Sequence, residues 1–162
     1  MSDFPLDEER ANKAYETLVK YLAGSARSEQ ECKNKLYDKG FHKGEVDFAI
    51  DKAKSYRYVD DEEYVRTFLL FNKSRYGVRK IVYKLTTEKG VDKQKVEDIV
   101  YDEIDDDFEV ELAEKFAQKF VKSKKITDKS DAKKVGAHLF QKGFDWRIID
   151  KVMSKLFDVY ED

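Results

Sequence analysis

The sequence has few of the residues that cross-link or interrupt a polypeptide chain. Its 162 residues include one cysteine, one proline and seven glycines. Cys32 has no second cysteine to pair with, so an internal disulfide is excluded. The scarcity of proline and glycine leaves too few turn residues for a sheet of many short strands, which argues against an all-β fold.

Long apolar runs are also missing. No stretch approaches the roughly 20 apolar residues that a membrane-spanning helix needs. The N-terminal residues do not resemble a signal peptide either. We therefore expect a soluble protein of the cytoplasm, where an unpaired cysteine stays reduced.

Charge, in contrast, is abundant and unevenly distributed. Asp, Glu, Lys and Arg make up 41% of the residues, against about 25% in an average globular domain, and such an excess is typical of long amphipathic helices. The formal net charge is only −2, yet Val65–Val96 holds nine bases and two acids, whereas Asp102–Glu111 holds seven acids and no base. The composition predicts an all-α protein, and its near-neutral total charge conceals separate basic and acidic blocks of sequence.

A short motif occurs three times. Residues 36–41 read Leu-Tyr-Asp-Lys-Gly-Phe, residues 139–144 read Leu-Phe-Gln-Lys-Gly-Phe, and residues 85–91 read Leu-Thr-Thr-Glu-Lys-Gly-Val, with one extra residue before the glycine. The three glycines are 50 and 53 residues apart. Lysine followed by glycine is a helix stop, because glycine adopts the left-handed conformation without a Cβ clash. The repeat therefore predicts a similar helical unit in each third of the chain.

Each copy has the pattern of three helices, of which the first is long and carries an apolar stripe at helical spacing. These first helices are predicted over residues 7–23, 61–75 and 108–123, with the following stripe residues: Ala14, Leu18, Tyr21 and Leu22; Tyr64, Phe68 and Phe71; Leu112, Phe116 and Phe120. We predict an all-α fold of three tandem three-helix repeats, about nine helices in an elongated, curved array. The predicted units are residues 1–58, 59–106 and 107–162.

The order of several motifs resembles that of RecX regulatory proteins. The motifs are Arg27-Ser28-Glu29-Gln30-Glu31, Val59-Asp60-Asp61-Glu62-Glu63-Tyr64, Tyr76-Gly77-Val78-Arg79-Lys80-Ile81 and the three lysine-glycine stops. The resemblance runs from about residue 12 to residue 157. It implies a bacterial, cytosolic modulator of the RecA recombinase that lies along the groove of the RecA–DNA filament, mostly inhibits ATPase and strand-exchange activity, and has no catalytic site. Val78 and Cys32 depart from the family pattern, which often has proline and leucine there.

The sharpest candidate site is the basic segment Lys73–Lys80, which surrounds a turn and the start of a helix. Backbone N–H groups at a helix start favour an anion, so phosphates or acidic protein groups would suit this segment. A simpler interpretation is that Tyr76 and Gly77 shape the helix junction while the bases are solvated. The residues predicted to contact a partner or DNA are Arg66, Lys73, Arg75, Arg79, Lys80, Lys84, Lys122, Lys124 and Lys125.

The remaining motifs favour no catalytic or metal site. His42 and His138 have no ligand partners at metal-binding spacing, and the acidic run lacks the glycine of a calcium loop. Trp146 is expected to be a hydrophobic anchor under the third repeat. We expect a non-enzymatic monomer without cofactor that binds the RecA filament and its DNA. The alternatives are a nucleic-acid-binding module or an adaptor acting without RecA, although the near-neutral net charge argues against strong binding to DNA alone.

Overall fold

Several helices in this chain begin at a residue whose side chain caps the first turn. In the computed structural model, which describes residues 5–126 and 129–157, Ser28 and Glu31 form a reciprocal capping box. Asp60 and Asp105 likewise accept hydrogen bonds from the backbone N–H groups of Glu63 and Phe108, at 3.2 and 2.8 Å. The α-helices of the described residues are α1 (Glu8–Gly24), α2 (Glu29–Asp38), α3 (Lys43–Ser55), α4 (Asp61–Asn72), α5 (Val78–Tyr83), α6 (Lys93–Glu103), α7 (Asp106–Lys124), α8 (Ala132–Gln141) and α9 (Trp146–Phe157).

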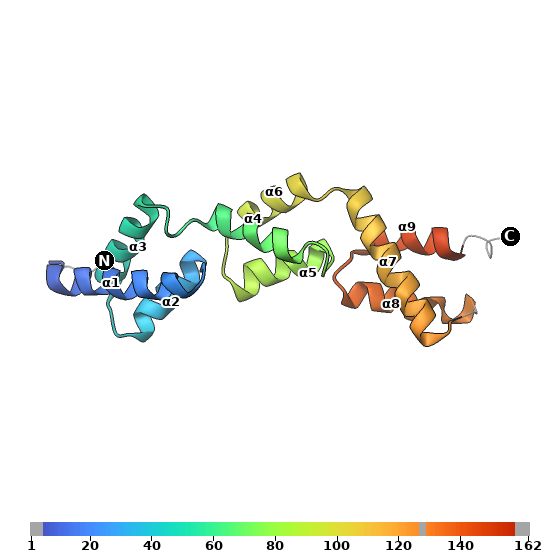
Figure 1. Cartoon of the computed structure of the whole chain (residues 1–162), viewed down its shortest axis with the longest axis horizontal. Coiled ribbons are helices and arrows are strands. Elements are labelled where there is room, and N and C mark those ends of the chain that lie inside the picture. Colours follow the sequence, from blue (N-terminus) through green and yellow to red (C-terminus); the bar gives the residue numbers. More distant parts are fainter. Residues whose placement is uncertain (1–4, 127–128, 158–162) are drawn as a thin grey trace.

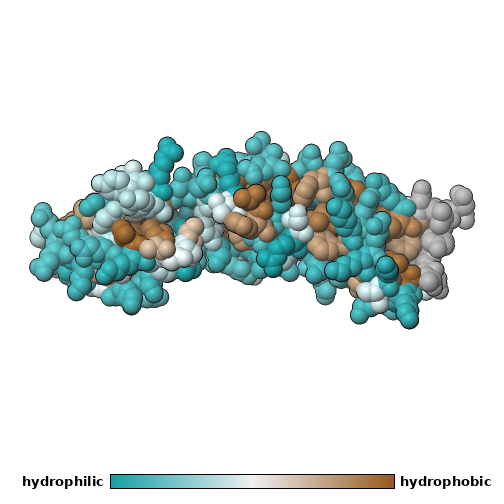
Figure 2. Space-filling model, in the orientation of Figure 1, coloured by the Kyte–Doolittle hydropathy of each residue, from teal (hydrophilic) through white to brown (hydrophobic). Residues whose placement is uncertain are grey.

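The helices form three triplets that follow one another along an elongated, bowed molecule (Figures 1 and 2). Helices α1–α3, α4–α6 and α7–α9 make the three triplets, and no strand occurs in the described part of the chain. The closest helix packing lies within a triplet: α1 lies on α3, α4 on α6, and α7 on α9. The prediction of an all-α array of three-helix repeats is confirmed.

Each triplet has its own apolar core, built from the positions that the repeat predicts. Leu18, Leu36 and Val46 are fully buried in the first core, for example, and Val135, Leu139 and Ile149 in the third. Two residues near the predicted unit boundaries pack across them. Val59 belongs to the first core, and Phe108 packs against the second. The division after residues 58 and 106 stays a prediction; its outermost residues, 1–4 and 158–162, lie outside the described part of the chain.

The extra residue of the middle repeat is accommodated in a π-helical turn. This turn, Lys84–Glu88, continues α5 directly. A π-helical turn holds one more residue than an α-helical turn, so Leu85 remains fully buried although the glycine follows it by five positions instead of four. The Val91 N–H reaches the Leu85 carbonyl at 3.0 Å, as the Phe41 N–H reaches Leu36 at 3.1 Å.

One stripe residue lies on the wrong side of its helix. Phe71 is 71% exposed, so its prediction as an inward-facing residue of α4 is wrong. The buried face of α4 is formed by Val65 and Leu69, which are four residues apart. Phe71 follows Leu69 by two residues, or about 200° around the helix, and therefore points to solvent.

Candidate interaction surface

The basic segment Lys73–Lys80 joins α4 to α5 and contacts the third triplet directly. The Gly77 N–H donates to the Lys142 carbonyl at 2.8 Å, and the Arg79 N–H donates to the Gly143 carbonyl at 2.9 Å. The two glycines allow this approach: a Cβ added to Gly77 would lie 2.4 Å from the carbonyl carbon of Gly143. Part of the predicted site is therefore a joint between the second and third triplets.

A buried carboxylate completes this joint. Glu109 Oε1 of α7 accepts the backbone N–H of Val78, the first residue of α5, at 2.9 Å. Only 6% of Glu109 is exposed. Burial raises the pKa of Glu109 to about 7, although the hydrogen bond from Val78 acts in the opposite direction. The carboxyl group therefore titrates near neutral pH while it holds the two triplets together.

The side chain of Arg79 also contacts the third triplet at this joint. Its guanidinium donates to the carbonyl oxygen of Phe140 and lies 4.0 Å above the centroid of the Phe140 ring. Trp146 stacks on the same ring, with 5.1 Å between the two centroids. Trp146 is 54% exposed because it lies at the start of α9, outside Phe140, so the prediction of an anchor beneath the repeat is wrong.

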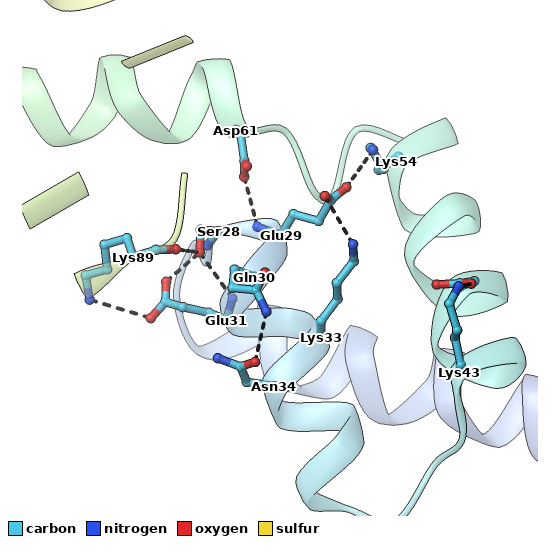
Figure 3. Close-up of polar contacts among 11 residues, drawn as sticks. Ser28, Glu29, Gln30, Glu31, Lys33, Asn34, Lys43, Lys54, Asp61 and Lys89 are labelled. Carbon is cyan, nitrogen blue, oxygen red and sulfur yellow. Dashed lines mark hydrogen bonds and ion pairs between the residues drawn. The ribbon is translucent and has the colours of Figure 1, made fainter. Parts of the chain in front are cut away.

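The first and second triplets meet in a similar joint (Figure 3). The Ser28 hydroxyl donates to the Lys89 carbonyl at 2.5 Å, and the Glu29 N–H donates to Asp61 Oδ1 at 2.8 Å. Lys89 Nζ lies 3.5 Å from Glu31 Oε2. A Cβ added to Gly90 would lie 2.7 Å from the Gln30 side chain.

The two joints follow one rule. In each, the residue that caps the second helix of one triplet donates to the lysine carbonyl of the next triplet's lysine-glycine stop: Ser28 to Lys89, and Gly77 to Lys142. The first amide of that second helix then donates to a carboxylate from the first helix of the next triplet. Sequence reasoning interpreted the stops only as helix ends. The recurrence of the lysine-glycine stops was the available sequence signal for the joints, but it did not show which residues the stops contact.

Three other bases of the predicted site gather around one aromatic ring. The charged ends of Arg75, Lys80 and Lys84 lie 5.5, 5.1 and 5.2 Å from the centroid of Tyr76. We call these four residues the Tyr76 cluster. Among the described residues, one ion pair involves these cations: Lys84 Nζ lies 3.7 Å from Glu88 Oε2. The cluster combines positive charge with an aromatic ring, a pairing suited to phosphates and bases.

The remaining predicted bases lie elsewhere. Arg66 pairs with Glu62 and Glu103, at 3.5 and 3.3 Å. Lys73 lies over the ring of Phe108, with 5.5 Å between Nζ and the centroid. Three exposed bases lie at the C-terminal end of α7, in the third triplet: Lys122, Lys124 and Lys125. The predicted set is thus divided among the joint (Arg79), the Tyr76 cluster, the end of α7, and two separate positions, Arg66 on α4 and Lys73 just after it.

Metal-binding groups and the cysteine can be assessed in the described part of the chain. The described residues contain no group of three or more His, Cys, Asp or Glu side chains placed to hold a metal ion. Cys32 is fully buried, and burial raises the pKa of its thiol to about 12, which keeps it protonated and unreactive at neutral pH. Among the same residues, no helix combines the length and the apolar character needed to cross a membrane.

Comparison with known proteins identifies the family. Residues 14–52 match the family model for the first three-helix domain of RecX, and residues 106–153 match the model for its third three-helix domain. The regulatory protein RecX of Clostridioides difficile (strain 630) is 34% identical over an alignment of 163 positions. This alignment covers 96% of this chain and 74% of that protein. The chain belongs to the RecX family of regulatory proteins. The predicted family membership is confirmed.

Other RecX proteins agree in sequence and fold. The regulatory protein RecX of Clostridium botulinum (strain Eklund 17B / Type B) is 30% identical over 154 residues, covering 92% of this chain and 72% of that protein. The crystal structure of RecX from Lactobacillus salivarius superposes with a TM-score of 0.83 at 24% identity, covering 94% of this chain and 99% of that chain. This structural likeness supports the arrangement of the three triplets.

Proposed function

We propose that this RecX protein binds the RecA–DNA filament and inhibits the ATPase and strand-exchange activities of the recombinase. It acts without a catalytic site or cofactor, as a monomer in the cytoplasm. The observation that carries the proposal is similarity to regulatory RecX proteins over almost the whole chain, 96% of it for the Clostridioides difficile relative. The joints support it as well, because they hold the triplets as one extended surface.

The proposed mechanism depends on length and repetition. An elongated array offers moderate contacts on each triplet, and contacts that are linked in one chain raise the total affinity through effective concentration. A bound array that follows the groove of the filament would block movement between recombinase subunits and the entry of a second DNA. The Tyr76 cluster and the bases at the end of α7 are the proposed contacts with phosphates or acidic groups.

The first prediction tests the Tyr76 cluster. We expect the triple variant Arg75→Glu, Lys80→Glu and Lys84→Glu to co-sediment with RecA–DNA filaments at least tenfold more weakly near 150 mM salt, because it replaces three positive charges with negative ones. The same variant should no longer lower ATP hydrolysis by RecA on single-stranded DNA. Arg79 is left unchanged because it holds the joint.

The matched control is Lys13→Glu with Lys20→Glu, two exposed bases on α1. It should bind and inhibit like the wild type, while circular dichroism checks that both variants stay folded. Equal binding by the triple variant and the control would remove the Tyr76 cluster from the interface. Unchanged ATP hydrolysis at saturating, demonstrably bound wild-type protein would contradict inhibition.

A nucleic-acid-binding module that acts without RecA is a second candidate, and the Tyr76 cluster is the observation that favours it. The formal net charge of −2 argues against it, because affinity for DNA comes largely from neutralised phosphates. Co-sedimentation with filaments, with DNA alone and with RecA alone across a salt series separates the candidates. Binding to DNA alone as tight as to filaments would favour the module, and binding to neither DNA nor RecA would favour an adaptor for another protein.

A further inference from the structure

An apolar groove lies beside α7, near the junction of the second and third triplets. It has a volume of about 300 Å³, and its apolar lining is Phe108, Leu112 and Phe116 of α7. Ser74, which follows α4, and Lys115 and Lys119 of α7 also line it. Figure 2 shows hydrophobic residues at the surface of the molecule over α4 and α7.

The floor of the groove has the geometry of a helix-binding stripe. Phe108, Leu112 and Phe116 follow one another at intervals of four residues, so they lie along one face of α7 and span about 12 Å, or two helical turns. Each is only half-buried: Phe108 packs against the second core, and the other two pack against the third. A partner helix reaches such a stripe with side chains one turn apart.

The charges around the floor are mainly positive. Lys73 Nζ lies 5.5 Å from the centroid of Phe108, and Lys142 Nζ lies 5.7 Å from that of Phe116. Lys115 and Lys119 stand on the same helix as the floor. Glu111 is the acidic lining residue, and it lies 3.7 Å from Lys115. Lys73, Lys119 and Lys142 form no ion pair with the described residues. Their positive charges are therefore available to pair with acidic groups of a binding partner.

We propose that this groove binds an acidic, amphipathic protein segment. Apolar side chains one turn apart fill the floor, and flanking Asp or Glu residues face the lysines. Nucleic acid fits less well, because a phosphate backbone would leave the apolar floor unfilled. The proposal goes beyond the proposed function: it names the chemistry of a protein segment, and it requires neither DNA nor a recombinase.

Fluorescence anisotropy with a labelled 14-residue peptide tests the proposal. The peptide carries Leu or Phe at three positions one turn apart and Glu at its flanking positions. One control peptide has Ala in place of the apolar residues, and another has Lys in place of Glu. We expect binding of the first peptide and at least tenfold weaker binding of both controls, because the first control lacks the anchors and the second repels the lysines.

Two variants of the full chain locate the peptide. Ser74→Trp fills the groove from the exposed turn after α4, and Lys115→Glu with Lys119→Glu reverses the charge of the rim. Each should weaken peptide binding at least tenfold, whereas Lys13→Glu with Lys20→Glu on α1 should stay within twofold of the wild type. Circular dichroism confirms that all variants fold. Equal binding of the anchored peptide and its Ala control, or unchanged binding by Ser74→Trp, would overturn the proposal.

The same proteins separate this proposal from the proposed function. Peptide binding is measured without RecA or DNA, and filament binding is measured by co-sedimentation. A wild type that co-sediments with filaments but does not bind the peptide overturns the groove proposal alone. A wild type that binds the peptide through the groove but does not co-sediment with filaments supports the groove proposal and overturns the proposed function.

Discussion

Single residues decide how the triplets of this RecX protein are joined. Glu109 is the clearest case, because one side chain of α7 accepts the first backbone N–H of α5 in the neighbouring triplet. Asp61 has the same role in the first joint, where burial raises the pKa of its carboxyl group although the Glu29 N–H it accepts acts oppositely. Glu109 is buried and Asp61 is half-buried, and both lie at a contact between triplets, so their protonation affects the joint as well as the local helix.

The protonation of Glu109 predicts a specific dependence of stability on pH. Its pKa rises from the ordinary 4.5 to about 7 in the folded protein. Between these values the folded state keeps a proton that the unfolded state releases, so this contribution to the free energy of unfolding is largest at acid pH and is lost as pH rises through 7. The nearby Asp145 carboxylate raises this pKa further, whereas Arg147 lowers it.

Glu109→Gln should remove this dependence. A glutamine oxygen can still accept the Val78 N–H, but it carries no buried charge at any pH. We expect urea unfolding at pH 8 to show a variant that is more stable than the wild type, by about 1 to 3 kcal/mol, and a flatter profile between pH 5 and 8. The exposed Glu111→Gln on the same helix is the control. A wild-type profile for Glu109→Gln would contradict the role assigned to this carboxyl group.

At the scale of elements, the π-helical turn Lys84–Glu88 shows how a repeat tolerates a change of length. In the first and third repeats the glycine follows the buried leucine by four positions, and in the middle repeat by five. An extra residue in a continuous α-helix would rotate everything after it by about 100°. The wider turn absorbs that rotation, so Leu85 and the stop at Gly90 both keep their places.

This interpretation predicts that the extra residue is dispensable. Deleting the exposed Thr87 should convert the π-helical turn into an α-helical turn and leave the protein folded, with a free energy of unfolding within about 1 kcal/mol of the wild type. Deleting the exposed Asn34 from α2 is the comparison, because it would turn Leu36 out of the first core and destabilise the protein by several kcal/mol. Urea unfolding measures both. Equal destabilisation by the two deletions would argue against an inserted residue in the π-helical turn.

At the scale of the whole molecule, the lysine-glycine stops decide whether the triplets act as one array. Gly90 and Gly143 lie against the preceding triplet, whereas a Cβ added to Gly40 would meet nothing within 4 Å. At the first stop, the Arg10 guanidinium donates to the Gly40 carbonyl at 3.0 Å, which parallels the bond from the Arg79 N–H to Gly143. The three stops thus share a backbone conformation, but only the second and third belong to joints in the described part of the chain.

The stops therefore allow a matched test of the joint. Gly143→Ala and Gly40→Ala both force alanine into a left-handed conformation, with φ of +103° and +90°, at a shared cost of about 1 kcal/mol. The alanine at 143 would also bring a Cβ within 2.3 Å of Lys80 Cβ. We expect Gly143→Ala alone to change the small-angle X-ray scattering profile and to weaken filament binding. Identical scattering from the two variants would contradict a joint at Gly143.

The sequence by itself determined the helices, the period and the family. Helix starts and stops depend on local chemistry, such as the capping box of Ser28 and Glu31 and the left-handed glycines, and the spacing of apolar residues then defines the three cores. The exposure of Phe71 could not be predicted as reliably, because it depends on which of two overlapping apolar faces packs on α6.

Only the tertiary structure decided what the basic segment does. The sequence places Arg75, Arg79 and Lys80 together, but in space Arg79 enters the joint while the other two face Tyr76. Glu109 and Gly143 are 32 and 66 residues beyond Gly77 in the chain, so no local pattern connects them to it. The backbone approach at Gly77 and the burial of Glu109 arise only when two triplets pack together. That packing separates the residues that hold the array from those left to bind a partner.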